Sequence, residues 1–113
     1  MSTQKYNSLN KLKSTLEEKI ARRLQFNSEY EPDTDLIDDF IDNAINEIKV
    51  WRKTTEDTEL LSGVYDSNII SFVIESYNMM GVEGQSYDGN GSTTKQYLGT
   101  PLARLKGSIP QRL

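Results

Sequence analysis

The chain of 113 residues contains no cysteine and no histidine. The absence of cysteine excludes disulfides and thiolate metal sites, and the absence of histidine removes the commonest general base and metal ligand of proteins. Long apolar runs are also missing: no window approaches the roughly 20 apolar residues that span a bilayer, and the N-terminal MSTQKYNSLNKLK lacks the apolar core of a secretory signal. We therefore expect no enzyme, no cofactor, no metal and no membrane contact, and a protein that stays in the cytoplasm where it is made.

Charge is present but is segregated along the chain. Residues 1–26 carry six basic and two acidic side chains (+4), residues 27–94 carry three and fifteen (−12), and residues 95–113 carry four and none (+4), which sums to −4. The basic ends and the acidic middle either satisfy each other within one molecule or join one copy to the next. The second arrangement is a head-to-tail contact, and such contacts close into rings or extend into filaments.

Helical periodicity predicts three main helices. The first, over residues 7–26, has an apolar stripe and a basic opposite face, which either is solvated or meets an acidic partner. The second, over residues 33–53, has a wide apolar face, and Asp33 is its expected N-cap. The third, over residues 66–80, contains few charges and is expected to be mostly buried.

A C-terminal segment follows a glycine-rich stretch. We predict an arm or hairpin over residues 81–100, because Gly81 is placed to end the third helix and DGNG is a strong turn signal. Residues 101–113 allow one short helix before Pro110, and the final SIPQRL is expected to reach away from the bundle. The prediction is a single all-α domain over residues 1–113, a small bundle of three main helices plus a short C-terminal helix.

The glycine-rich stretch does not match the ligand-binding loops that it could imitate. It lacks the lysine of a Walker A loop, and no helix follows its glycines as a dinucleotide loop requires. As an EF-hand starting at Asp88 it has Thr93 where glycine is needed and Gly99 where glutamate is needed. The stretch is therefore interpreted as an assembly arm.

An acidic cluster at the start of the second helix suggests a metal site or a nuclease, because carboxylates are the ligands of Mg²⁺. Its members lie within two turns: Asp35, Asp38, Asp39 and Asp42. A two-metal nuclease also needs ligands from a second element and a lysine or histidine for proton transfer, and the sequence does not supply that set. A capped, solvated acidic face is favoured, with a charged surface between subunits as the alternative.

The sequence resembles the head-tail connector (adaptor or head-completion) proteins of long-tailed bacteriophages. The resemblance is carried by Tyr77-Asn78-Met79-Met80-Gly81-Val82-Glu83-Gly84, a Gly/Ser-rich stretch, Tyr97, Pro101-Leu102 and a basic C-terminus. In that family a helix ends in a pattern similar to Tyr-Asn-x-x-Gly-x-Glu-Gly, followed by a Ser/Gly arm and a Leu-Pro or Pro-Leu segment. The Asp-rich start of the helix at residues 33–53 matches the family's usual opening, so the likeness covers roughly residues 33–113. The helix at residues 7–26 is longer and more charged than the family's usual start.

The resemblance implies a structural protein of the virion, made in the host bacterial cytoplasm. It would form a homo-oligomeric, twelvefold ring below the portal protein after DNA packaging, extend the DNA channel, and dock a stopper, tail-completion or other connector protein. Genomic DNA would pass through the ring without sequence-specific binding, and an acidic lumen formed by the cluster in the second helix would keep DNA from adhering. The alternative is a small α-helical adaptor or regulator that forms no ring.

The resemblance also implies two groups of contact residues. The arm that contacts a neighbouring copy or the next ring would contain Gly81, Glu83, Gly84, Tyr87, Gly89, Gly91 and Tyr97. The tail that docks on the portal would contain Pro101, Leu102, Arg104, Lys106, Ile109 and Arg112.

Overall fold

The structure is a computed structural model that describes residues 4–26, 31–83 and 100–111. Its helices are α1 (Leu9–Phe26), α2 (Thr34–Trp51), α3 (Thr58–Leu61) and α4 (Asp66–Glu83), followed by a C-terminal helix over residues 100–107. The described residues contain no strand. The prediction of an all-α fold is confirmed.

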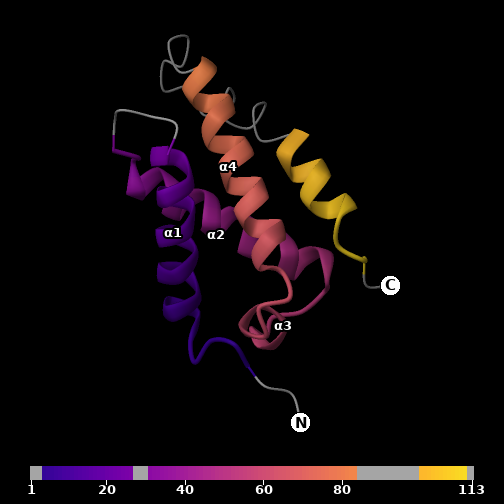
Figure 1. The fold of residues 1–113 in the computed structure, drawn as a ribbon. Helices are drawn as coiled ribbons and strands as arrows, with labels where there is room; N and C mark the ends of the chain where they lie inside the picture. Colours follow the sequence, from indigo (N-terminus) through magenta and orange to yellow (C-terminus); the bar gives the residue numbers. More distant parts are fainter. Residues whose placement is uncertain (1–3, 27–30, 84–99, 112–113) are drawn as a thin grey trace.

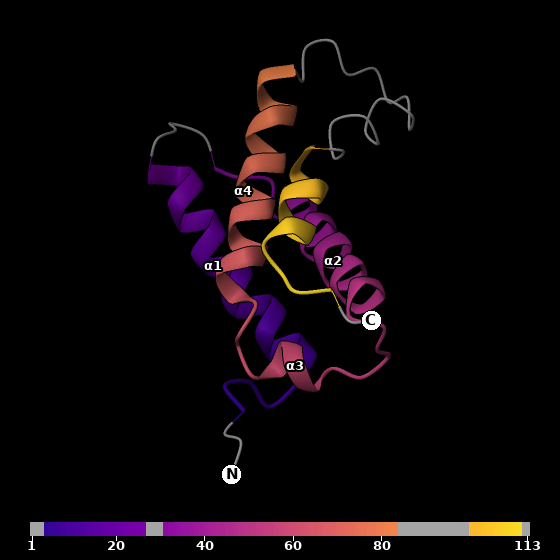
Figure 2. The same ribbon diagram turned by 90° about the vertical axis from the view of Figure 1, so that its right-hand side faces the viewer.

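The three long helices form the body of the molecule. α2 packs against both α1 and α4, and α1 also packs against α4. Figure 1 shows α1 and α4 upright beside each other with α2 crossing behind them, and Figure 2 shows the C-terminal helix between α4 and α2. The C-terminal helix therefore covers the side of the α2–α4 pair that α1 leaves open.

The core is made by the apolar stripes that the periodicity predicts. Each long helix contributes side chains with almost no exposed area, and burying one such side chain is worth about 1.5–3 kcal/mol. The core residues with 0% exposure are Leu12, Leu16 and Ile20 of α1, Ile37, Ile41 and Ala44 of α2, and Ile69 and Val73 of α4. These residues fix which face of each helix turns inward, and hence which charges remain outside.

The start of α2 is held at two points. The carboxylate of Asp33 accepts a hydrogen bond from the backbone N–H of Leu36 at 3.2 Å, which confirms the predicted N-cap. The backbone N–H of Asp33 in turn donates to the hydroxyl of Tyr77 in α4 at 2.8 Å. The first turn of α2 is thus tied directly to α4.

The connection between α2 and α4 contains α3, which the sequence analysis did not predict. α3 has only four residues, too few for a periodic pattern, and it places Leu60 in the core with 2% exposure. Gly63 follows with a φ of +84°, a left-handed conformation that glycine adopts without steric cost.

The segment before α1 is fixed to this same region. The backbone N–H of Tyr6 donates to the carbonyl of Leu61 at 3.0 Å. The Tyr6 hydroxyl and the Lys5 ammonium both donate to Oδ2 of Asp66, at 2.5 Å and 2.9 Å. Burial, followed by the hydrogen bond to Asp66, raises the pKa of Tyr6, so its hydroxyl remains a donor.

One predicted helix end is wrong. α4 does not stop at Gly81 but continues to Glu83. A glycine within a helix costs only about 1 kcal/mol relative to alanine, so it ends a helix only where the following chain provides a better alternative. The rest of the predicted arm, residues 84–99, lies outside the described residues.

The two described glycines outside α4 give a matched test of backbone strain. A Cβ at Gly63 would adopt an unfavourable positive φ and lie 2.6 Å from Cδ of Lys5, whereas a Cβ at Gly107 would meet nothing within 4 Å. We expect Gly63→Ala to lower the free energy of unfolding by about 1–2 kcal/mol, and Gly107→Ala to leave it unchanged or raise it by up to about 1 kcal/mol. Urea denaturation of both variants checks this difference, and equal effects would contradict the assigned conformation of Gly63.

Candidate interaction surfaces

The C-terminal segment packs on the bundle through one apolar stripe. Pro101, Leu105 and Ile109 recur every four residues and are buried, with Ile109 only 4% exposed. Four-residue spacing places Pro101 and Leu105 on one side of the helix, Ile109 follows just beyond its end, and Leu105 and Ile109 belong to the hydrophobic core. The segment is therefore part of the core of this chain.

The chain after this helix is held across the end of α2. The indole N–H of Trp51 donates to the carbonyl of Ile109 at 2.7 Å, and the guanidinium of Arg52 donates to the carbonyl of Pro110 at 2.9 Å. The prediction that SIPQRL reaches away from the bundle is therefore wrong for residues 108–111. The tail packs because Ile109 is buried and because the side chains of Trp51 and Arg52 need hydrogen-bond acceptors. The sequence of the tail alone indicates neither of these contacts.

This packing changes which residues of the expected portal-docking tail are accessible. Pro101 and Ile109 are buried and Leu102 is half-buried, so their side chains are already used within the chain. Arg104 is exposed and lies 3.3 Å from Glu75 of α4, and Lys106 is half-buried and lies 3.3 Å from Glu47 of α2. The structure thus leaves Arg104 as the accessible member of the set, while Arg112 lies outside the described residues.

A groove of about 320 Å³ runs between α4 and the C-terminal helix. Its polar lining consists of Ser67, Asn68, Ser71, Glu75, Arg104 and Ser108. The amide of Asn68 donates to the hydroxyl of Ser108 at 2.9 Å, so part of this lining is occupied by a contact within the chain. The groove offers hydroxyl and amide groups for hydrogen bonds, and its two charged side chains, Glu75 and Arg104, form an ion pair with each other.

The predicted acidic cluster is divided in two by the packing of α1 on α2. Asp38 and Asp42 are half-buried and turn toward α1, where Asp42 lies 2.6 Å from the ammonium of Lys13. Asp35 and Asp39 are exposed on the outer side of α2. The four carboxylates lie within an arc of roughly 100° around α2, and Asp38 and Asp42 form the edge of this arc that faces α1.

Glu17 of α1 is brought against this cluster, a contact that the sequence analysis did not predict. A hydrogen bond to the carboxyl of Asp38, then desolvation, then the negative charges of Asp38 and Asp35 raise the pKa of Glu17 to about 7. The carboxyl groups of Glu17 and Asp38 can share one proton, so the pair is most stable when only one of the two groups is ionised. Only the periodicity of both helices taken together could have indicated this pair, because the two residues belong to separate elements.

The described residues provide no metal site and no membrane span. No group of three or more acidic side chains in residues 4–26, 31–83 and 100–111 is arranged to hold a metal ion. Within those same ranges, no helix is both long and apolar enough to cross a bilayer.

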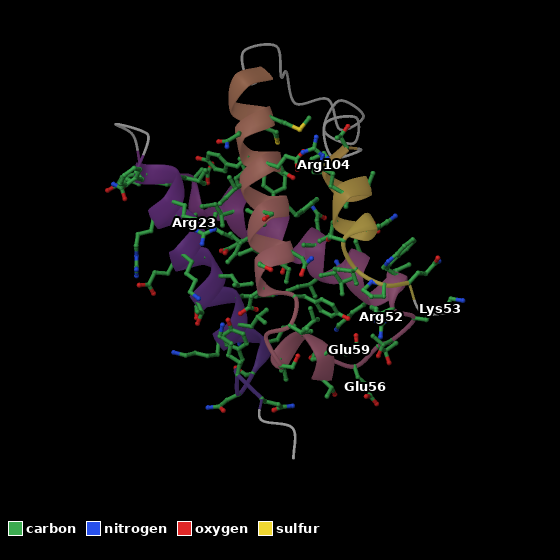
Figure 3. The ribbon with its side chains drawn as sticks, turned by 45° about the vertical axis from the view of Figure 1, so that its right-hand side comes forward. Arg23, Arg52, Lys53, Glu56, Glu59 and Arg104 are labelled. Carbon is green, nitrogen blue, oxygen red and sulfur yellow. The ribbon has the colours of Figure 1, made fainter. Side chains whose placement is uncertain are left out.

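A polar junction joins the end of α2 to α3, α4 and the tail (Figure 3). Arg52 donates to both carboxylate oxygens of Glu59, at 3.0 Å and 3.3 Å, and the hydroxyl of Tyr65 donates to Glu59 Oε1 at 2.6 Å. Burial, followed by the hydrogen bond to Glu59, raises the pKa of Tyr65 to about 12, so it stays protonated at neutral pH. The partners of Arg52 lie in α3 and in the tail, which have no periodic pattern of their own, so the sequence does not indicate this junction.

The outer side of α1 carries the basic residues that the sequence predicts there. Lys11, Lys19, Arg22 and Arg23 are all exposed, and Arg22 forms an ion pair with Glu18 one turn earlier. Phe26, at the end of the helix, is 87% exposed, an unusual value for a large aromatic side chain. This surface is therefore cationic with an apolar end.

Of the expected contact arm, only two residues fall within the described chain. Gly81 and Glu83 belong to the last turn of α4. Gly84, Tyr87, Gly89, Gly91 and Tyr97 lie outside the described residues.

The packing of the tail gives a direct test. We expect Ile109→Ala to lower the free energy of unfolding by about 2–3 kcal/mol, because it removes buried apolar atoms and leaves a cavity. Gln111→Ala, two residues later at an exposed position, is the matched control and should change stability by less than about 0.5 kcal/mol. If Ile109→Ala and Gln111→Ala were equally stable in urea denaturation, the tail would not contribute to the core.

The Glu17–Asp38 pair predicts a pH dependence. The pKa of Glu17 is about 7 in the folded chain against an ordinary 4.5, so its contribution to stability is complete below pH 4.5 and is lost as pH rises through about 7. We expect Glu17→Gln to stabilise the protein at pH 8 by up to about 1 kcal/mol and to have little effect at pH 5. Denaturation at both pH values measures this, with Glu18→Gln, which instead loses an exposed ion pair with Arg22, as the control.

Comparison of the chain with family models, with curated proteins and with solved structures found no match.

Proposed function

We propose that this protein is a structural head-tail connector of a long-tailed bacteriophage, which assembles as a ring below the portal after DNA packaging. The observation that carries the proposal is the Tyr77–Asn78 motif near the end of α4, followed after α4 by a glycine-rich stretch and a short C-terminal helix. This order of elements is the one that the resemblance implies.

The position of Tyr77 supports treating the motif as one unit with the acidic start of α2. Its hydroxyl accepts the hydrogen bond from the backbone N–H of Asp33 at 2.8 Å. Two features on which the resemblance rests, the motif at the end of one helix and the Asp-rich opening of another, are therefore in contact. A tyrosine at this position has a specific structural role, which is to hold the start of α2 beside α4.

The surface chemistry also favours assembly over catalysis. The two charged groups that line the groove beside the C-terminal helix, Glu75 and Arg104, pair with each other, and the carboxylates of α2 are divided between a contact with α1 and the outer surface. The buried part of the chain is one small core, so most of the charged side chains lie on the outside, where partners can reach them.

The packed tail refines how such a protein would meet a portal. Docking through Pro101 and Ile109 would first require their release from the core, at the cost of apolar burial. Docking without release would use the exposed side of the C-terminal helix, where Arg104 lies next to Glu75. We favour the second route because it keeps the fold intact.

Electron microscopy of the purified protein mixed with its cognate portal tests this function. We expect a ring of copies bound coaxially to the portal. A matched variant in which residues 85–98 are replaced by a glycine–serine linker of equal length should keep the helical circular dichroism and lose the ring. If the full chain remains monomeric or dimeric in the presence of the portal, the adaptor or regulator alternative is correct.

A further inference from the structure

Two exposed cations of α1 are available for contact with another molecule. Lys19 and Arg23 lie one helical turn apart, and within the described part of the chain neither forms an ion pair. Glu17, which contacts α2, lies on the opposite side of the helix: at 100° per residue, Lys19 and Arg23 are roughly 160° and 120° away from it. We call Lys19 and Arg23 the cationic flank of α1, and this flank turns away from α2.

Two exposed carboxylates of α2 form a surface of opposite charge. Asp35 and Asp39 also lie one helical turn apart, on the side of α2 opposite to the buried Ile37 and Ile41. Among the described residues no cation forms an ion pair with either of them, and Lys13 of α1 pairs with Asp42 instead. We call Asp35 and Asp39 the acidic face of α2, and it lies on the side of the helix away from the core, next to the carboxylates that face α1.

The two surfaces lie near the same end of the molecule. α1 ends and α2 begins at the same end of the bundle (Figure 1). Arg23 lies three residues before the end of α1 and Asp35 one residue after the start of α2, so both lie close to that end of the bundle. Lys19 and Asp39 each lie one helical turn further from it.

We propose that copies of this chain bind side by side, with the cationic flank of α1 in one copy against the acidic face of α2 in the next. Among the described residues, no ion pair joins the two surfaces within one copy. When neighbouring copies are related by rotation about an axis parallel to the long axis of the bundle, the same end of the bundle points the same way in every copy. The cationic flank of one copy then lies opposite the acidic face of the next. A perpendicular twofold axis would instead bring the cationic flank to the other end of α2, where Lys53 lies.

The charges therefore select a head-to-tail contact, in which each copy uses two different surfaces. Charge pairs of this kind, at the rim of an interface, determine orientation and partner more than affinity. Phe26 adds an apolar contact: it lies three residues after Arg23, and the same end of α2 in the next copy presents the half-buried Pro32 and Leu36. An exposed aromatic beside basic residues is a common composition for the centre of a protein interface.

The inference rests on the proposed function, because a closed ring is what such a contact builds, and it goes further by naming the two surfaces. Nucleic acid is a less suitable occupant of the cationic flank. The flank has two cations, the chain carries a net charge of −4, and duplex DNA is bound mainly by the neutralisation of many phosphates.

Charge reversal with rescue tests the contact in the full-length chain. Sedimentation analysis measures self-association of the wild type and of two variants, Lys19→Glu with Arg23→Glu and Asp35→Lys with Asp39→Lys. We expect each variant alone to associate at least about tenfold more weakly, and an equimolar mixture to recover, because each supplies the surface that the other lacks. Lys53→Glu, an exposed reversal away from both surfaces, should have no effect. Failure of the mixture to recover, or binding of duplex DNA that is lost with Lys19→Glu and Arg23→Glu, would overturn the proposal.

Cross-linking detects the contact even where association is weak. The chain contains no cysteine, so an Arg23→Cys chain and a tagged Asp35→Cys chain form a mixed disulfide only through contact between copies. We expect efficient mixed cross-linking from this pair and little from Lys11→Cys with Asp35→Cys, because Lys11 lies three turns lower on α1. Equal cross-linking of both pairs, or none from either, contradicts the shared position at one end of the bundle on which the proposal depends.

The failure of this contact and the failure of the connector function can be distinguished. A ring on the portal that persists after Asp35→Lys with Asp39→Lys would disprove the contact and leave the function intact. Conversely, association that shows charge rescue in a protein that forms no ring with the portal would establish the contact and disprove the function.

Discussion

The packing of α2 against three partners is the constraint on which the rest of the structure depends. One side of α2 meets α1, another meets α4, and a third meets the C-terminal helix, so its wide apolar stripe is almost entirely covered. Both ends of α2 are also fixed from outside the helix, by the Tyr77 hydroxyl at Asp33 and by the tail carbonyls at Trp51 and Arg52. A helix restrained at this many points has one orientation, and that orientation determines which of its carboxylates face solvent.

The functional character of the molecule follows from how charge is distributed after packing. At the contact between α1 and α2, Lys13 forms an ion pair with Asp42, and Glu17 is hydrogen-bonded to Asp38. Arg52 forms an ion pair with Glu59. The remaining exposed charges are mainly basic on α1 and acidic on α2, and no ion pair joins these two groups among the described residues. This distribution of charge is the basis of the proposed contact between copies, in which basic side chains of one copy meet acidic side chains of the next.

The sequence predicted the long helices well because their apolar side chains repeat over many turns, and Asp33 as the N-cap because capping is local. It did not predict α3, whose four residues are too short for a period, or the continuation of α4 past Gly81. It was wrong about the tail because the donors that hold it, Trp51 and Arg52, lie 58 residues earlier in the chain. The acidic cluster was correctly located, but its division into an inner and an outer pair requires knowledge of where α1 packs.

The indole of Trp51 has a practical consequence. It is the only tryptophan of the chain, and its N–H is bonded to the carbonyl of Ile109 with the ammonium of Lys106 5.9 Å from the ring centre. Its emission spectrum is therefore sensitive to whether the last residues are seated, with no background from another indole. The molecule carries a built-in optical reporter of its own tail, readable during titration with any binding partner.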